Sequence, residues 1–158
     1  FFMEGAMPVG FFSFPESTVA HPDYPLLLPL IMTWVYKFIG FNDVIVTLIM
    51  PVFYIAFLSL FYAVSVKFFK RTHALLTVFI LATIPQVSDY ASLIHADFLL
   101  MAFITTSFMY FALFMFKDDS VALGFSIFFL ALSFFAKNEA IVHVIIFMIV
   151  YAAFLYNR

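Results

Sequence analysis

Five long stretches without any Asp, Glu, Lys or Arg constrain the fold of this chain more than any other feature. Backbone groups inside a lipid bilayer must be hydrogen-bonded within their own segment, which favours helices for apolar runs of this length. A membrane-spanning helix needs about 20 apolar residues, within a range of roughly 17 to 25. Four stretches reach that length, and the shortest reaches it only by extending past Pro85. They cover residues 44–66, 74–88, 98–116, 120–136 and 140–156.

The composition excludes a soluble globular domain. The chain of 158 residues is 66% hydrophobic and only 10% charged, whereas about a quarter of the residues in globular domains are charged. The expected fold class is therefore all-α: a polytopic helical membrane protein with about five transmembrane helices and one further interfacial or re-entrant helix.

That further helix is predicted over residues 24–36. This apolar segment has only 13 residues before Lys37, and it carries Pro25 and Pro29. As a helix it would be about 20 Å long, which is shorter than the roughly 30 Å hydrocarbon core. We therefore expect it to return to the side on which it starts. In the alternative, Lys37 extends its charge to the interface and residues 26–41 cross the membrane.

Residues 1–23 are predicted to form an outer loop, and residues 24–158 a transmembrane helical domain. Glycine and proline interrupt the first segment, while its phenylalanines favour a loop lying partly on the membrane interface. A disordered chain end is the alternative. No basic n-region of a signal peptide precedes the apolar runs, and the sequence stops directly after one of them. We expect an internal piece of a longer protein.

Lysine and arginine placement predicts the orientation. If the spans alternate in direction, Lys67, Lys70, Arg71, Lys117 and Arg158 lie on one side of the membrane. This excess favours the cytoplasmic side under the positive-inside rule. The other side, periplasmic or lumenal, then holds Asp97 together with Lys137, Asn138 and Glu139. Lys37 is ambiguous.

Several functional classes lack support. A net charge of −2 gives no reason to expect a nucleic-acid partner, and the absence of cysteine excludes thiolate metal sites within this chain. The sequence contains no glycine-rich phosphate loop, nucleophile elbow or His-Glu-x-x-His motif.

Polar residues at the ends of the apolar runs are the candidates for chemistry. His21, Asp23 and Tyr24 lie on a proline-stiffened turn that could orient them toward a headgroup or a metal, or that could simply lead into a helix. Asp97 could cap the helix that follows it, or it could point into a cleft between helices.

Lys137, Asn138 and Glu139 form a short polar connection between two apolar runs. An exposed helical hairpin is one interpretation. In the other, the lysine holds a phosphate as a point charge, because a cation on the outer side opposes the charge bias. Glu139 and His143 are four residues apart and would share one helix face.

Three segments together resemble the GT-C superfamily of membrane glycosyltransferases. The similarity is to the bacterial branch related to protein O-mannosyltransferases, lipid A aminoarabinose transferases and Rgt-type lipopolysaccharide glycosyltransferases. The segments are Ala-His-Pro-Asp-Tyr-Pro-Leu-Leu-Leu-Pro at residues 20–29, Tyr90 through Ala96-Asp97-Phe98-Leu99, and Leu-Ala-Leu-Ser-Phe-Phe-Ala-Lys-Asn-Glu-Ala at residues 130–140. The chain departs from the family pattern at Phe98-Leu99, Ala136 and Ala140.

The resemblance implies sugar transfer from a polyprenyl-phosphate-linked donor to a glycan, lipid or protein acceptor at the outer face of the bacterial plasma membrane. By similarity Lys137 contacts the lipid phosphate, and Asp97 positions the acceptor, the donor sugar or a metal. His21, Asp23 and Tyr24 line the donor pocket, with Glu139 as a further substrate-binding residue. The catalytic base of the family follows a span that would precede Phe1.

The cofactor is left open, with a divalent metal as one option. A polytopic transporter or permease remains the alternative function. Transporters place ionisable groups near the bilayer midplane on broken helices, and Pro51 and Pro85 could break helices here. The charges of this chain lie instead at the ends of its apolar runs.

Overall fold

The computed structural model describes residues 25–157, and within that range every regular element is a helix. Apolar runs become helices because a helix pairs its own backbone groups without help from water. The all-α membrane fold predicted from the sequence is therefore confirmed. In chain order the helices are α1 (Leu27–Ile39), α2 (Asp43–Thr47), α3 (Ile49–Ser65), α4 (Arg71–Thr83), α5 (Pro85–Ser92), α6 (Ala96–Lys117), α7 (Ser120–Ala136) and α8 (Ala140–Tyr156).

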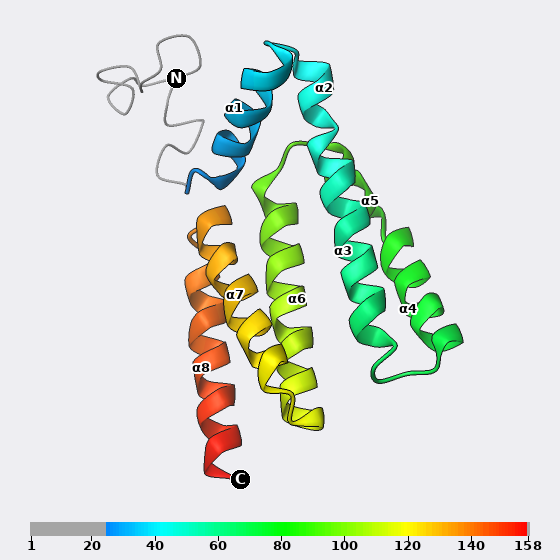
Figure 1. Ribbon diagram of the computed structural model, residues 1–158, viewed down its shortest axis with the longest axis vertical. Coiled ribbons are helices and arrows are strands. Elements are labelled where there is room, and N and C mark those ends of the chain that lie inside the picture. The colour runs from blue at the N-terminus through cyan, green and yellow to red at the C-terminus, as the bar shows by residue number, and fades with distance from the viewer. Residues whose placement is uncertain (1–24, 158) are drawn as a thin grey trace.

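The long helices alternate in direction, as the sequence predicts (Figure 1). Helices α3, α6 and α8 run one way, while α4 with α5, and α7, run back. One end of the bundle therefore carries the start of α6 and the connection between α7 and α8, and we call it the Lys137 end. The opposite end carries Lys67, Lys70, Arg71 and Lys117.

Helix lengths agree with a membrane location to different degrees. Helices α2 and α3 follow each other directly and together form an apolar segment of 23 residues, Asp43–Ser65, while α6 has 22 residues. Both segments are long enough to cross a bilayer. Helices α7 and α8 have 17 residues each, at the lower limit for a span. Large apolar side chains face outward along the bundle, for example Phe79 and Ile149.

Helices α4 and α5 are one apolar segment that bends by 66°. Pro85 begins α5, and because proline has no N–H it cannot continue the hydrogen-bond ladder of α4. Tyr54 of α3 donates its hydroxyl hydrogen to the backbone oxygen of Ala82 at this break, over 3.1 Å. The predicted stretch 74–88 is therefore a broken helix, and it forms either a bent span or a re-entrant loop.

Helix α1 stands beyond the ends of α6 and α7, at the Lys137 end (Figure 1). Its buried Leu28 packs in one cluster with Ala136 at the end of α7. The Tyr36 hydroxyl donates to Oδ1 of Asp43 over 2.5 Å, which joins α1 to α2. With 13 residues, α1 is shorter than a membrane-spanning helix needs to be.

The predicted helix covers residues 24–36. The observed α1 begins later, at Leu27, and continues past Lys37 to Ile39. Lysine is a good helix former, and Pro29 lies in the first turn, where its missing N–H is not needed. The helix ends at Gly40, which has φ 76°, a conformation that glycine adopts without strain.

Two apolar clusters form the core, and α6 contributes to both. Phe98 and Leu99, both fully buried, lie in the cluster nearest the Lys137 end, and Phe111 lies in the cluster nearest the other end. Between them, Ser107 donates to the backbone oxygen of Ser126 over 2.8 Å. These small side chains let α6 and α7 approach closely, and this packing fixes the start of α6 against the end of α7.

Candidate functional site

Three side chains meet at the Lys137 end, one from the first turn of α6 and two from the connection between α7 and α8. Asp97 is the second residue of α6, Lys137 directly follows α7, and Glu139 directly precedes α8. At Lys137 the backbone becomes extended, while its N–H still donates to the Ser133 oxygen over 3.1 Å. The lysine side chain therefore projects from the end of α7 toward the first turn of α6, where Asp97 lies.

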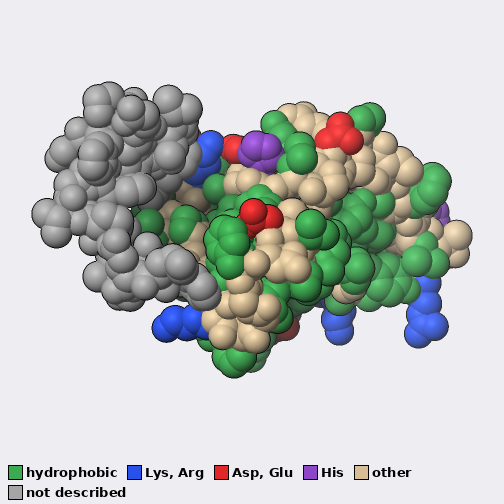
Figure 2. Space-filling view, turned by 90° about the horizontal axis from the view of Figure 1, so that it is seen from above, with side chains coloured by type: hydrophobic (Ala, Val, Ile, Leu, Met, Phe, Trp, Pro, Cys, Tyr) green, Lys and Arg blue, Asp and Glu red, His purple; other side chains and the backbone are tan. Residues whose placement is uncertain are grey.

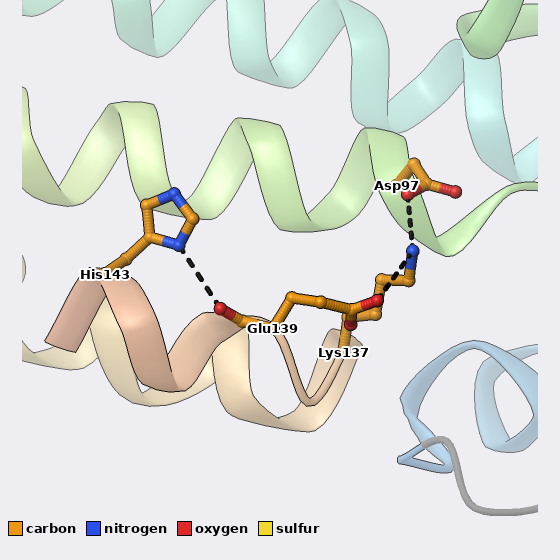
Figure 3. Close-up of polar contacts among 4 residues, drawn as sticks. All are labelled: Asp97, Lys137, Glu139 and His143. Carbon is orange, nitrogen blue, oxygen red and sulfur yellow. Dashed lines mark hydrogen bonds and ion pairs between the residues drawn. The ribbon is translucent and has the colours of Figure 1, made fainter.

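The amine of Lys137 contacts both carboxylates (Figure 3). Its Nζ lies 2.7 Å from Oδ1 of Asp97 and 3.3 Å from Oε1 of Glu139. The lysine side chain is only 13% exposed, whereas the Asp97 and Glu139 side chains are 48% and 49% exposed. The amine is thus held beneath two half-exposed carboxylates, at the boundary between the apolar core and the polar end.

The carboxylates keep Lys137 protonated. The hydrogen bond to Asp97 is the main cause that raises the pKa of the Lys137 amine above its ordinary value, and the hydrogen bond to Glu139 adds to it. Partial burial lowers the pKa, and this effect is smaller than that of the Asp97 hydrogen bond but larger than that of the Glu139 hydrogen bond. At neutral pH the Lys137 amine is therefore protonated and carries a positive charge.

Asp97 does not cap α6. The N-cap position belongs to His95, whose side chain makes no capping hydrogen bond, and Asp97 lies in the first turn. A carboxylate there still interacts favourably with the helix dipole, but its Oδ1 accepts from Lys137 instead of from the backbone of α6. The capping interpretation of Asp97 is therefore wrong, and its carboxylate instead contacts a side chain from the connection between α7 and α8.

His143 does not join the cluster. It lies one turn along α8, and its Nδ1 is 3.4 Å from the backbone oxygen of Glu139 (Figure 3). The predicted i, i+4 proximity to Glu139 holds, but the imidazole approaches the backbone and not the carboxylate. The tautomer of the ring decides whether Nδ1 donates in this contact.

The described part of the chain contains no cluster of side chains that could bind a metal ion. Within residues 25–157 no three His, Asp or Glu side chains lie close enough together to hold a metal ion. Asp97 and Glu139 both contact the lysine ammonium. His21, Asp23 and Tyr24, together with the loop 1–23, lie outside the described residues.

Sequence reasoning missed two contacts that support this end of the bundle. One is the hydrogen bond between Tyr36 and Asp43, which sets α1 against α2. The other is the ring contact between Tyr90 and His95, with centroids 5.5 Å apart, in the connection that leads to Asp97. Each pair joins two elements across a turn. The spacing of apolar residues within a helix therefore predicts neither contact.

Comparison with known proteins supplies the family. Residues 23–158 match the model of the family described as dolichyl-phosphate-mannose-protein mannosyltransferase. No curated protein and no solved structure matches the chain. The matched range includes Asp97, Lys137 and Glu139. The match agrees with the resemblance drawn from the sequence motifs. The chain therefore belongs to the dolichyl-phosphate-mannose-protein mannosyltransferase family of membrane glycosyltransferases, which is of the GT-C type.

Proposed function

We propose that the full-length protein transfers a sugar from a polyprenyl-phosphate-linked donor to an acceptor at the outer face of a membrane. The observation that carries this proposal is the pairing of Lys137 with Asp97 over 2.7 Å at one end of a membrane helix bundle. A cation and a carboxylate side by side are the two kinds of group that glycosyl transfer from a lipid phosphate needs.

In the proposed reaction the bond between the sugar and the phosphate oxygen breaks, and the polyprenyl phosphate leaves with the bonding electrons. The acceptor hydroxyl oxygen forms the new glycosidic bond and loses its proton to a base. Lys137 stabilises the negative charge that develops on the phosphate, and Asp97 positions the acceptor or the donor sugar. His21, Asp23, Tyr24 and Glu139 are the further substrate-binding residues of the proposal.

The proposed orientation rests on the charges of the bundle. Lys67, Lys70, Arg71 and Lys117 gather at the end opposite to Lys137, which favours that end as cytoplasmic. Seen from the Lys137 end, acidic and histidine side chains lie among apolar ones, with Lys and Arg side chains toward the edge of the outline (Figure 2). We place the Lys137 end in the periplasm of a bacterial plasma membrane, with a glycan, lipid or protein as acceptor.

A transporter has less support. The broken helix α4–α5 is the described feature that transporters share, yet Thr83, Ile84 and Pro85 at the break carry no charge. The ionisable pair lies instead at the end of the bundle. The family match favours a transferase as well.

The test is sugar transfer by the full-length protein in membranes supplied with labelled polyprenyl-phosphate sugars. Lys137→Ala should reduce turnover by at least about a hundredfold, the usual cost of losing a group that stabilises a transition state. Asp97→Asn should reduce it by about a hundredfold as well, because a misplaced substrate reacts slowly. Lys117→Ala, at the opposite end, is the matched control and should retain activity. Wild-type turnover in both site variants would refute the assigned roles.

A further inference from the structure

The Lys137 amine is already neutralised by its neighbours. One ammonium contacts two carboxylates, at 2.7 Å in Asp97 and 3.3 Å in Glu139. The three side chains together therefore carry one positive and two negative charges. A phosphate that approached this amine would meet two carboxylates of its own sign at nearly the same distance, and like charges at such distances repel one another.

The two carboxylates differ in how they are attached. Glu139 belongs to the same short connection as Lys137, two positions along the chain. Asp97 comes from another helix, 40 positions away, and makes the shorter contact. Its side chain is half exposed, and its second carboxylate oxygen points away from the lysine (Figure 3). A rotation of the Asp97 side chain alone would therefore remove the shorter of the two contacts with the amine.

We propose that Asp97 and the donor phosphate compete for Lys137, so that donor binding releases the Asp97 carboxylate for the acceptor. This inference rests on the proposed function. Donor binding then precedes acceptor binding, because Asp97 is engaged by the amine until the phosphate takes its place. When the polyprenyl phosphate leaves, Asp97 returns to Lys137 and the site is reset.

The test measures binding of undecaprenyl phosphate to the purified full-length protein in detergent. Asp97→Asn keeps the side-chain shape but removes the competing charge, so it should bind this lipid about threefold to tenfold more tightly than wild type. Glu139→Gln should also bind more tightly, by a smaller factor, because its contact is longer. Lys137→Ala should lose this binding, and adding Asp97→Asn to it should restore none.

Undecaprenol, which lacks the phosphate, is the control ligand. It should bind wild type and Asp97→Asn equally, because the competition concerns charge alone. A preference of Asp97→Asn for undecaprenol as well would overturn the inference. Unfolding temperatures of all variants in the same detergent confirm that each is folded before binding is compared.

Failure of the inference can be told apart from failure of the proposed function. If binding to wild type depends on Lys137 but Asp97→Asn binds equally or more weakly, the competition is wrong and the phosphate contact stands. If Lys137→Ala binds undecaprenyl phosphate as well as wild type does, the phosphate contact itself is wrong and the competition falls with it. Tighter binding by Asp97→Asn that depends on Lys137 supports both.

Discussion

Nζ of Lys137 and Oδ1 of Asp97 lie 2.7 Å apart, although 40 positions separate the two residues in the chain. The contact joins the first turn of α6 to the turn between α7 and α8. Because the Asp97 side chain is half exposed, the pair should add little to stability, as is usual for ion pairs that water can reach.

A double-mutant cycle measures that contribution. Asp97→Asn, Lys137→Met and the combined variant should show a coupling free energy of about 0.5–1 kcal/mol for unfolding in detergent. A small coupling together with a large loss of transfer indicates that the pair serves the reaction. A coupling above about 3 kcal/mol would instead identify a structural ion pair.

The raised pKa of Lys137 predicts low chemical reactivity of its amine. A raised folded-state pKa means that the stabilisation by the protonated amine is complete below the unfolded-state pKa. It is lost only as the pH rises through the higher, folded-state value. An ordinary lysine has a pKa of about 10.4. Between pH 6 and about pH 10, Lys137 should therefore stay protonated, and its contribution to stability should not change with pH.

Acylation by an amine-reactive reagent, read by mass spectrometry at pH 9, tests this directly, because only the unprotonated amine reacts. Asp97→Asn lowers the pKa of Lys137 toward its ordinary value, and each unit of that change gives about tenfold more free amine. Lys137 should react faster in Asp97→Asn than in wild type, while Lys117 reacts equally in both. Equal rates at Lys137 would contradict the ion pair.

The break between α4 and α5 makes the Tyr54 hydroxyl a stabilising group. It donates to the Ala82 oxygen where the helix loses its own donors. Tyr54→Phe leaves that oxygen unpaired in apolar surroundings, which should cost about 1–3 kcal/mol. Tyr62→Phe, on the same helix, removes a hydroxyl with no hydrogen bond among the described residues and should be nearly neutral. Equal unfolding temperatures for both variants in detergent would refute this role.

Much of the fold could be predicted because apolar runs and charges constrain membrane helices strongly. Alternating the uncharged stretches places Asp97 and Lys137 at one end of the bundle, and their 2.7 Å contact confirms it. Pro85 is a position where the sequence allows a helix to break, and the structure shows a bend of 66° there, an angle that the sequence does not give. A proline in a membrane helix is tolerated when a neighbour supplies the missing hydrogen bond, and Tyr54 does so from a different helix.

The details of the site could not be predicted from spacing. Lys137, Asn138 and Glu139 are compatible with an exposed hairpin, and only the packing of α6 against α7 brings Asp97 to the amine. The same holds for Tyr36 and Asp43, which meet because Gly40 turns the chain between α1 and α2. Contacts of this kind depend on how helices pack, which a single sequence does not specify.

The close approach of α6 and α7 predicts sharply different effects for two substitutions at Ser107. This side chain is fully buried and donates to the Ser126 oxygen. Ser107→Ala removes one hydrogen bond between membrane helices, which is worth about 0.6 kcal/mol on average, so the unfolding midpoint should change little.

Ser107→Leu inserts three further carbon atoms between the same helices and should cost about 1–3 kcal/mol or more, because packed interfaces do not expand freely. It should also reduce sugar transfer, since the packing of α6 on α7 holds Asp97 beside Lys137. Phe128→Leu, on the exposed face of α7, is the control for a change of apolar volume. Equal stability and activity in Ser107→Leu and Ser107→Ala would show that α6 and α7 are not closely packed at this position.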